Sequence, residues 1–496
     1  MAKPLLTDRR GSALRPAGPR PTPWLIWGLS FAAAAVLLVA PLPVAAAAAI
    51  GLVLLAGRDP LPTLCLVVIS LPFYLLPRSV GHYEFSPTEI LIGIATIAGV
   101  ARLVVAASPI WGGDVSASRG ALWAGRGRPA GRGQLRFLLG DSAMVKGPFG
   151  DRGLLVLALL FLIAGLVSLT ASVELHPSLQ SLRVIIVEPI VFYLLVVSQV
   201  RDRRGAFALA LALVVAGVLI SGTGLWQYLT NDRIITAEAG LRRIRGFYGS
   251  PNNLGLFLGR ALPMSVALAL WLPRGRVLWV AASVLMAVAL ILTFSIGAWV
   301  AVPVALLLVA LLRGRRAFVV GLALGLLGLL GSIVVALTIP RIGSHLDLSQ
   351  GTSAIRLDVW QSGLQMLADH PIRGIGLDNF LHYYQNGYRQ PTAWQDPNLS
   401  HPHNLVLDFW LSLGLAGPVL LGCLLGRFAE LVLQRWRRAG ALERGLSAGS
   451  AGALADLVCH GLVDNSFFLP DLAVLFWLMF AIVAVLQRAG ADASAR

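Results

Sequence analysis

The chain has 496 residues, of which 57% are hydrophobic and only 13% are charged. No water-soluble core could bury that much apolar surface, so the composition excludes a set of ordinary soluble domains. The formal net charge of +16 could indicate a nucleic-acid partner, but the placement of the basic residues, described below, argues against one. The three cysteines lie in apolar stretches without metal-binding spacing, so we expect buried thiols.

About fourteen apolar stretches run through the chain, and three of them are short for a membrane span. The sequence therefore predicts an all-α polytopic membrane protein with about 12–14 transmembrane helices. The first stretch begins at Trp24 after a basic segment and continues past Pro41 without a clear cleavage site, which favours an uncleaved span over a signal peptide. The stretches lie near residues 24–40, 42–57, 61–77, 87–107, 152–171, 181–200, 205–228, 252–272, 277–294, 296–312, 317–339, 403–426, 446–466 and 470–487.

The basic residues indicate which side each loop faces. If the N-terminus is cytoplasmic, most of the 40 Lys and Arg residues fall in cytoplasmic loops and span ends. The positive charge is then a topology signal, and we predict the cytoplasmic (inner) membrane as the location and no nucleic-acid partner. The predicted parts are a cytoplasmic basic tail (1–23), N-terminal transmembrane helices (24–107), a disordered cytoplasmic linker rich in Gly and Arg (108–151), central transmembrane helices (152–340), an extracytoplasmic catalytic loop (341–402), C-terminal transmembrane helices (403–487) and a tail (488–496).

Two outer loops are exceptions to this rule because they carry several arginines. They span residues 229–251 and 341–402, and the second is long enough to predict structure or function. Seven of the eight histidines also map to the outer side. This concentration predicts a reaction or binding site that faces outside.

The first of these segments precedes a predicted helix. Ser250 is the expected N-cap and Pro251 the first helical residue. Arg242, Arg243 and Arg245 come just before this helix, where guanidinium groups and a helix N-terminus together favour an anion. Contact with lipid headgroups is the alternative interpretation. Asn253, in the first turn, is included among the expected substrate contacts.

Arg260 lies about two turns inside the same apolar helix. A charge there costs on the order of 3 kcal/mol unless it is paired or faces water. Glu188, in another span, is a possible partner. We keep both a structural ion pair and substrate binding as roles for Arg260.

The long outer loop contains an amphipathic pattern from Ser353 to Ala368, which predicts an interfacial helix. Arg356 and Trp360 would lie one turn apart on it. A helix that only packs against its neighbours is the alternative. Gly374 and Gly376 predict a tight turn beyond it.

The third segment, residues 399–417, leads from the loop into an apolar helix. His401 or Ser400 could cap this helix, with Pro402 beginning it and His403 in its first turn. A histidine at a wet interface can accept a proton, although a structural role is equally open. No Asp or Glu nearby completes a recognisable metal set with the two histidines, so no metal and no cofactor are predicted.

Asp456, His460 and Asp464 are spaced four apart within the stretch 446–466. This spacing predicts one helix face, where ionisable groups rarely contact lipid. Polar packing between helices is the favoured interpretation, and a role beside the active cavity is the alternative.

Together these motifs resemble the O-antigen ligase and polymerase family of membrane glycosyltransferases. The resemblance covers roughly residues 240–425. It rests on R-x-R-G-F with P-N-N (243–253), on R-x-x-x-W followed by D-H-P-I-R-G-I-G (356–376), and on H-x-H-N (401–404). One departure is Ile296, in T-F-S-I-G-A, where many relatives carry an arginine. Arg242 or Arg260 could serve instead.

The resemblance implies an inverting, metal-independent transfer from a saccharide on undecaprenyl diphosphate. It assigns Arg245 and Arg356 to the diphosphate and His403 to activation of the acceptor hydroxyl. Arg242, Arg243, Arg260, Asn253, Trp360, His401 and Asn404 are the expected substrate contacts.

The chemistry agrees with this assignment, because guanidinium groups can stabilise the charge of a departing diphosphate without a metal. The expected partners are the lipid-linked donor, a glycan, lipid or protein acceptor, and membrane lipids. The sequence does not distinguish a ligase from a polymerase. An alternative from another functional class is a flippase or transporter of lipid-linked saccharides. Such a protein should carry charged residues at mid-membrane depth, in two repeated halves.

Overall fold

The computed structural model describes residues 23–107, 151–236, 242–338, 351–393 and 397–494. The predicted basic tail (1–23) and cytoplasmic linker (108–151) lie outside these ranges apart from the last residue of each. The described chain is helical except for loops and two short antiparallel pairs. These pairs are β1 (Arg78–Val80) with β2 (Tyr83–Phe85), and β3 (Ile235–Thr236) with β4 (Arg242–Arg243). The all-α prediction is confirmed.

Each predicted apolar stretch coincides with helical structure. The N-terminal helices are α1 (Pro23–Val39), α2 (Leu42–Arg58), α3 (Leu61–Ser70) and α4 (Pro87–Ala107). The central ones are α7 (Arg152–Ser168), α8 (Leu175–Ser181), α9 (Glu188–Gln199, joined to α8 through a π-helical turn), α10 (Arg203–Thr230), α11 (Pro251–Trp271), α12 (Arg276–Leu292), α13 (Ile296–Arg313) and α14 (Arg315–Thr338). The remaining helices are α16 (Gly351–Asp369), α17 (Phe380–Tyr383), α18 (Leu405–Leu413), α19 (Ala416–Trp436), α20 (Ala441–Gly461) and α21 (Pro470–Ser494).

Eight helical segments among the described residues are long and apolar enough to cross a membrane, and four more apolar helices are shorter. The chain is thus a polytopic membrane protein, while the number of 12–14 spans stays a prediction. Helix α20 is not among the eight although it has 21 residues. It carries Glu443, Asp456 and His460, which lower its hydropathy, and all three side chains are buried inside the bundle.

The centre of the bundle is formed by α11 and α21, whose spanning windows are 89% and 83% buried. Helix α20 packs closely on α11 because glycines face it: a Cβ added at Gly449 would lie 2.6 Å from the Met264 sulfur, and one at Gly452 would lie 2.8 Å from Cβ of Pro263. Small residues let two membrane helices approach closely. This contact brings buried polar groups of α11 and α20 together.

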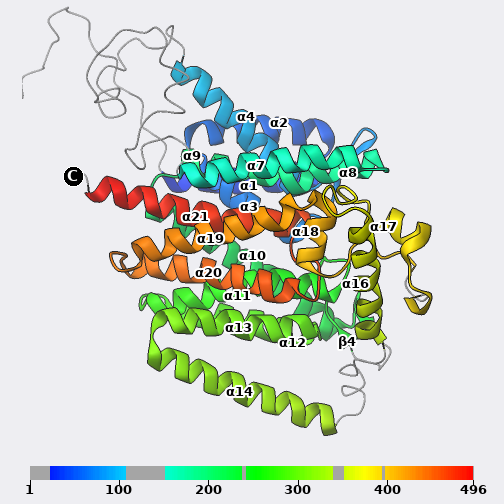
Figure 1. The fold of residues 1–496 in the computed structure, drawn as a ribbon. Helices are drawn as coiled ribbons and strands as arrows, with labels where there is room; N and C mark the ends of the chain where they lie inside the picture. Colours follow the sequence, from blue (N-terminus) through cyan, green and yellow to red (C-terminus); the bar gives the residue numbers. More distant parts are fainter. Residues whose placement is uncertain (1–22, 108–150, 237–241, 339–350, 394–396, 495–496) are drawn as a thin grey trace, which may run out of the picture.

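One end of the bundle carries a cap made from the long loop that is predicted to be extracytoplasmic. Figure 1 shows α16 lying across that end, at a large angle to the bundle helices, with α17, α18 and β4 nearby and the C-terminus at the opposite end. The cap has its own small core, which includes Val359, Met366, Phe380 and Tyr384. The predicted helix Ser353–Ala368 is observed as α16, and Gly374 and Gly376 adopt the positive φ angles, 65° and 87°, that the predicted turn requires.

Candidate active site

The H-x-H-N segment enters the bundle differently from the prediction. Asn404, not His401 or Ser400, is the N-cap of α18, and its side-chain oxygen accepts hydrogen bonds from the backbone N–H groups of Val406 and Leu407. An Asn side chain satisfies the free N–H groups of a first turn well. The helix therefore begins at Leu405, and the prediction that Pro402 begins it was wrong.

His403 consequently precedes the helix, with a φ of 51°. This left-handed conformation is uncommon for a residue with a side chain, and it costs free energy that surrounding contacts must supply. One such contact is the hydrogen bond from Nε1 of Trp360 to the carbonyl oxygen of His403, at 3.3 Å. Another is the hydrogen bond from Nδ2 of Asn404 to the carbonyl of Leu462, at 3.2 Å. These contacts fix the backbone at the point where His403 leads into α18.

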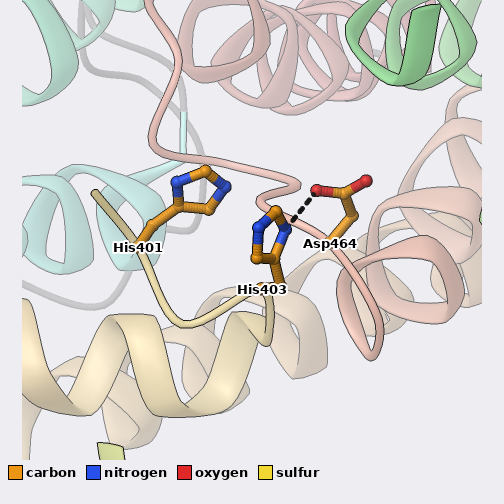
Figure 2. Close-up of side chains that lie close together, drawn as sticks. All are labelled: His401, His403 and Asp464. Carbon is orange, nitrogen blue, oxygen red and sulfur yellow. Dashed lines mark hydrogen bonds and ion pairs between the residues drawn. The ribbon is translucent and has the colours of Figure 1, made fainter. Parts of the chain in front are cut away.

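The imidazole of His403 is hydrogen-bonded to Asp464, with 2.9 Å between Nδ1 and Oδ1 (Figure 2). Asp464 lies beyond the end of α20 at Gly461, so the prediction that it shares a helix face with Asp456 and His460 was wrong. Its carboxylate also accepts the backbone N–H of Asn465, at 2.9 Å. The spacing of Asp464 in the sequence favoured polar packing, with a role beside the active cavity as the alternative, and its contact with His403 agrees with the alternative.

Asp464 is 4% exposed, and burial alone would raise the pKa of its carboxyl group. The hydrogen bond from His403, the charge that His403 carries when it is protonated, and the charge of Arg356 together outweigh burial and lower this pKa below its usual range. Asp464 is therefore ionised at neutral pH. A carboxylate in this position holds the proton of His403 on Nδ1 and leaves Nε2 with a free lone pair.

Helix α16 brings two predicted residues to this pair. Nη2 of Arg356 lies 3.8 Å from Oδ2 of Asp464, the oxygen not bonded to His403. Trp360, one turn further along, makes the hydrogen bond to the His403 carbonyl described above. Arg356 is 20% exposed and His403 19% exposed at their side chains, so both remain accessible to a ligand. The predicted neighbours Arg356, Trp360 and His403 thus form one site.

Of the three arginines before α11, Arg243 is the one whose charge interacts with this site. Its Nε donates to the carbonyl of Thr293 at 2.7 Å, and its Nη2 donates to Oδ1 of Asn252 at 2.8 Å. The pKa of Arg243 is lowered first by burial and then by the charge of Arg356. Two guanidinium groups close enough to repel each other indicate a place for an anion.

Arg242 and Arg245 have other partners. Arg242 donates to the carbonyl of Tyr228 and stacks over its ring, with the guanidinium carbon 4.7 Å from the centroid. Arg245 donates to the carbonyls of Arg233 and Gly249, at 3.3 and 3.4 Å. Among the residues that the structure describes, no hydrogen bond or ion pair joins either arginine to His403 or Asp464. Their predicted contacts with substrate stay predictions.

Ser250 is the N-cap of α11 and Pro251 its first residue, as predicted, and the Ser250 hydroxyl accepts the backbone N–H of Asn253. This capping bond places Asn253 in the first turn beside the arginine-bearing segment. The Asn residue that bonds Arg243 is its neighbour, Asn252. The predicted substrate contact of Asn253 stays a prediction.

Arg260 is 2% exposed and lies in the core between α11 and α20. It forms an ion pair with Asp456 and donates to the Ser466 hydroxyl and, at 2.9 Å, to the Ser466 carbonyl. The possible partner Glu188 is instead bonded to Arg183, at 3.2 Å. Arg260 therefore holds the segment after α20 in place, two residues from Asp464. Of the two roles left open by its sequence, the structural pair is the one these contacts support.

His401 lies against His403, with ring centroids 4.2 Å apart. Burial, followed by the charge of His403, lowers the pKa of His401 to about 3, so its imidazole is neutral at pH 7. The ligand atoms of His401, His403 and Asp464 lie within 4.8 Å of one another, close enough to hold a metal ion. The fold thus supplies the carboxylate that was missing from the sequence around the two histidines.

The position of these residues can be compared with known families. Residues 281–422 match the sequence model of the O-antigen ligase family. This segment of the chain is similar to the O-antigen ligase family. The matched segment includes Arg356, Trp360, His401 and His403, whereas Arg243 and Asp464 lie on either side of it. No curated protein matches the chain.

This match confirms the predicted resemblance and indicates a membrane enzyme of the glycosyltransferase type. Arg242 and Arg260 have the partners given above, and their predicted service in place of an arginine at Ile296 stays a prediction. The guanidinium nearest the T-F-S-I-G-A turn in the described contacts is that of Arg243, which bonds the carbonyl of Thr293.

Proposed function

We propose that this protein transfers a saccharide from an undecaprenyl-diphosphate donor to an acceptor hydroxyl on the outer face of the cytoplasmic membrane. The observation that carries the proposal is the His403–Asp464 pair at 2.9 Å, with the guanidinium group of Arg356 beside it. Glycosyl transfer from a diphosphate requires a base for the acceptor hydroxyl and a positive group for the departing anion. The His403–Asp464 pair would provide the base, and the guanidinium group would bind the anion.

The proton transfer follows from the hydrogen bond. Asp464 accepts from Nδ1 of His403, so Nε2 is the atom that takes the proton of the acceptor hydroxyl. As His403 becomes an imidazolium ion, the carboxylate of Asp464 stabilises its charge at short range. A positioned base of this kind contributes roughly 10²–10⁴ in rate.

The bond changes are those of a single displacement. The acceptor oxygen forms a bond to the anomeric carbon while the bond from that carbon to the diphosphate oxygen breaks, and the electron pair leaves with the diphosphate. Attack opposite the leaving group inverts the anomeric centre. Arg356 and Arg243 would stabilise the developing negative charge without a metal ion, and we assign Arg245 to the donor diphosphate as an outer contact.

The proposed orientation rests on the distribution of charge. The basic loops predicted to be cytoplasmic include the turn between α13 and α14, at Arg313–Arg316. The other end of α13 lies beside the segment that leads to Asp464, because a Cβ added at Gly297 would lie 3.2 Å from a methyl carbon of Val463. The donor would reach the site from the outer leaflet with its lipid tail in the membrane. Membrane lipids and a glycan, lipid or protein acceptor are the proposed partners.

The test is transfer by the purified protein from a polyprenyl-diphosphate saccharide, with lipid-core and repeat-unit acceptors offered separately and with EDTA present. Product on the lipid core would identify a ligase, and product extended by repeat units a polymerase. Movement of the donor across liposomes without any new glycosidic bond would support the transporter alternative and overturn the proposal. Loss of all transfer with EDTA, and its recovery with a divalent metal, would overturn metal independence.

A further inference from the structure

A second feature lies at the end of the bundle opposite His403. Helix α11 runs from Pro251, beside the candidate site, to Trp271, and next to its far end lies a cavity of about 870 Å³. The cavity is bounded by α11, α12, α13 and α14. Figure 1 shows α14 at the edge of the bundle, next to α13. A space of this size can take part of a lipid-sized molecule.

Four arginines line this cavity: Arg276 from the start of α12, Arg313 from the end of α13, and Arg315 and Arg316 from the start of α14. No acidic residue is among the lining residues, and within the described ranges no carboxylate forms an ion pair with any of the four. Four positive charges around one space without a counter-charge favour an anionic occupant.

Two of the guanidinium groups are positioned by the protein. Nε of Arg276 donates to the carbonyl of Ala269 at 3.1 Å, and Nε of Arg313 donates to the carbonyl of Leu270 at 3.1 Å. Arg313 also lies over the ring of Trp271, 5.6 Å from its centroid. Both bonds use Nε, so the terminal nitrogens can donate to the oxygens of a phosphate group.

The rest of the lining is largely apolar. Val266 and Leu270 of α11 and Val280 and Val284 of α12 form the walls. Val280 and Val284 are 46% and 57% exposed, so these walls remain open to an apolar occupant. A soluble anion would use the arginines and leave the walls uncovered, whereas a phospholipid would use both.

We propose that this cavity binds a membrane phospholipid with an anionic headgroup. Its phosphate would lie on the arginines and part of an acyl chain on the valines. Basic pockets between transmembrane helices on the cytoplasmic side are typical sites for such lipids, and this is the end that the Lys and Arg distribution predicts to be cytoplasmic. The inference is independent of the chemistry proposed at His403.

The test is native mass spectrometry of the purified, delipidated protein titrated with phosphatidylglycerol or phosphatidylcholine. We expect phosphatidylglycerol to bind more tightly. The double variant Arg276→Gln/Arg313→Gln should weaken that binding roughly 30-fold, because each basic residue near an anionic lipid contributes about fivefold. Arg274→Gln is the matched control, because Arg274 lies in the same turn, is exposed and does not line the cavity.

A second variant, Val284→Trp, keeps every arginine and places bulk against the apolar wall, so it should also weaken phosphatidylglycerol binding. If Arg274→Gln weakened phosphatidylglycerol binding as much as the double variant does, the binding would reflect only general charge attraction, and the proposal would be overturned. Equal binding of phosphatidylcholine, or full displacement of the lipid by inorganic phosphate, would overturn it as well. Thermal unfolding in the absence of lipid identifies any variant that fails to fold.

Discussion

Replacing the carboxylate of Asp464 with an amide is the sharpest test of the proposed base. In Asp464→Asn the side chain keeps its size, but Nδ1 of His403 loses an anionic partner at 2.9 Å. At an effective dielectric constant of about 20, two unit charges at this distance interact by roughly 6 kcal/mol, which is an upper bound for the imidazolium ion formed in the reaction. The 19% exposure of His403 reduces it.

We therefore expect a loss of about 3–5 kcal/mol of transition-state stabilisation, or roughly 10²–10⁴ in kcat, similar to the effect of amide substitution at other buried Asp–His pairs. The assay is transfer from the lipid diphosphate donor, with kcat and KM measured separately. KM for the donor should change less than kcat, because Asp464 contacts the base and not the donor in the proposed mechanism.

Asp471→Asn is the matched control. Asp471 is also a buried carboxylate at this end of the bundle, but it accepts a hydrogen bond from Tyr248, at 2.8 Å, which an Asn oxygen can still accept. Transfer by this variant should stay within about threefold of the unmodified protein, a change below 1 kcal/mol. If Asp464→Asn kept kcat within the same range, or if both variants lost activity equally, the assignment of His403 and Asp464 as the base would be wrong.

Three further results are expected. His403→Ala should lower kcat by at least roughly 10²-fold while protein abundance stays unchanged, and normal transfer in that variant would remove the base from the mechanism. Arg243→Gln should lower transfer more than Arg245→Gln, because Arg243 lies in the field of Arg356 whereas Arg245 bonds backbone carbonyls, and the reverse order would favour Arg245 as the diphosphate contact. In the folded protein the pKa of His401 is lowered to about 3, whereas that of an unfolded histidine is about 6.5. As the pH falls from about 6.5 towards 3, only the unfolded state takes up this proton, so the stability of the folded state decreases. The Tm of His401→Gln should therefore fall less over this interval than that of the unmodified protein, and parallel Tm curves would contradict the reasoning.

The features that the sequence predicted correctly depend on local chemistry. The Ser250–Pro251 start of α11, the helix around Arg356 and the glycine turn at Gly374 each follow from a few neighbouring residues. The apolar stretches were equally visible, because a membrane span must satisfy its backbone groups within the segment. These signals gave the fold class, whereas the resemblance to the O-antigen ligase family brought Arg356, Trp360 and His403 into one predicted site.

The residues that were missed depend on contacts across the chain. Asp464 and His403 are 61 positions apart, and the spacing of four from His460 extended the predicted helix past its true end at Gly461. A local signal for that end was present in Asp464, Asn465 and Ser466, since such residues often bond their own backbone in turns. Asn465 does so here, accepting the backbone N–H of Phe468 at 2.9 Å.

The buried ion pair of Arg260 and Asp456 links the membrane core to the candidate site, and its two contributions can be separated. Replacing the guanidinium group with an apolar side chain, in Arg260→Met, leaves Asp456 buried without its partner and should destabilise the protein by about 3–5 kcal/mol. In the double variant Arg260→Met/Asp456→Leu no buried charge is left unpaired, so much of this stability should return. Neither variant can donate to Ser466, however, so the segment that carries Asp464 loses an anchor in both. We therefore expect the double variant to regain its Tm while its kcat stays low. Recovery of both would show that Arg260 contributes only to folding, and that Asp464 is held in place without it.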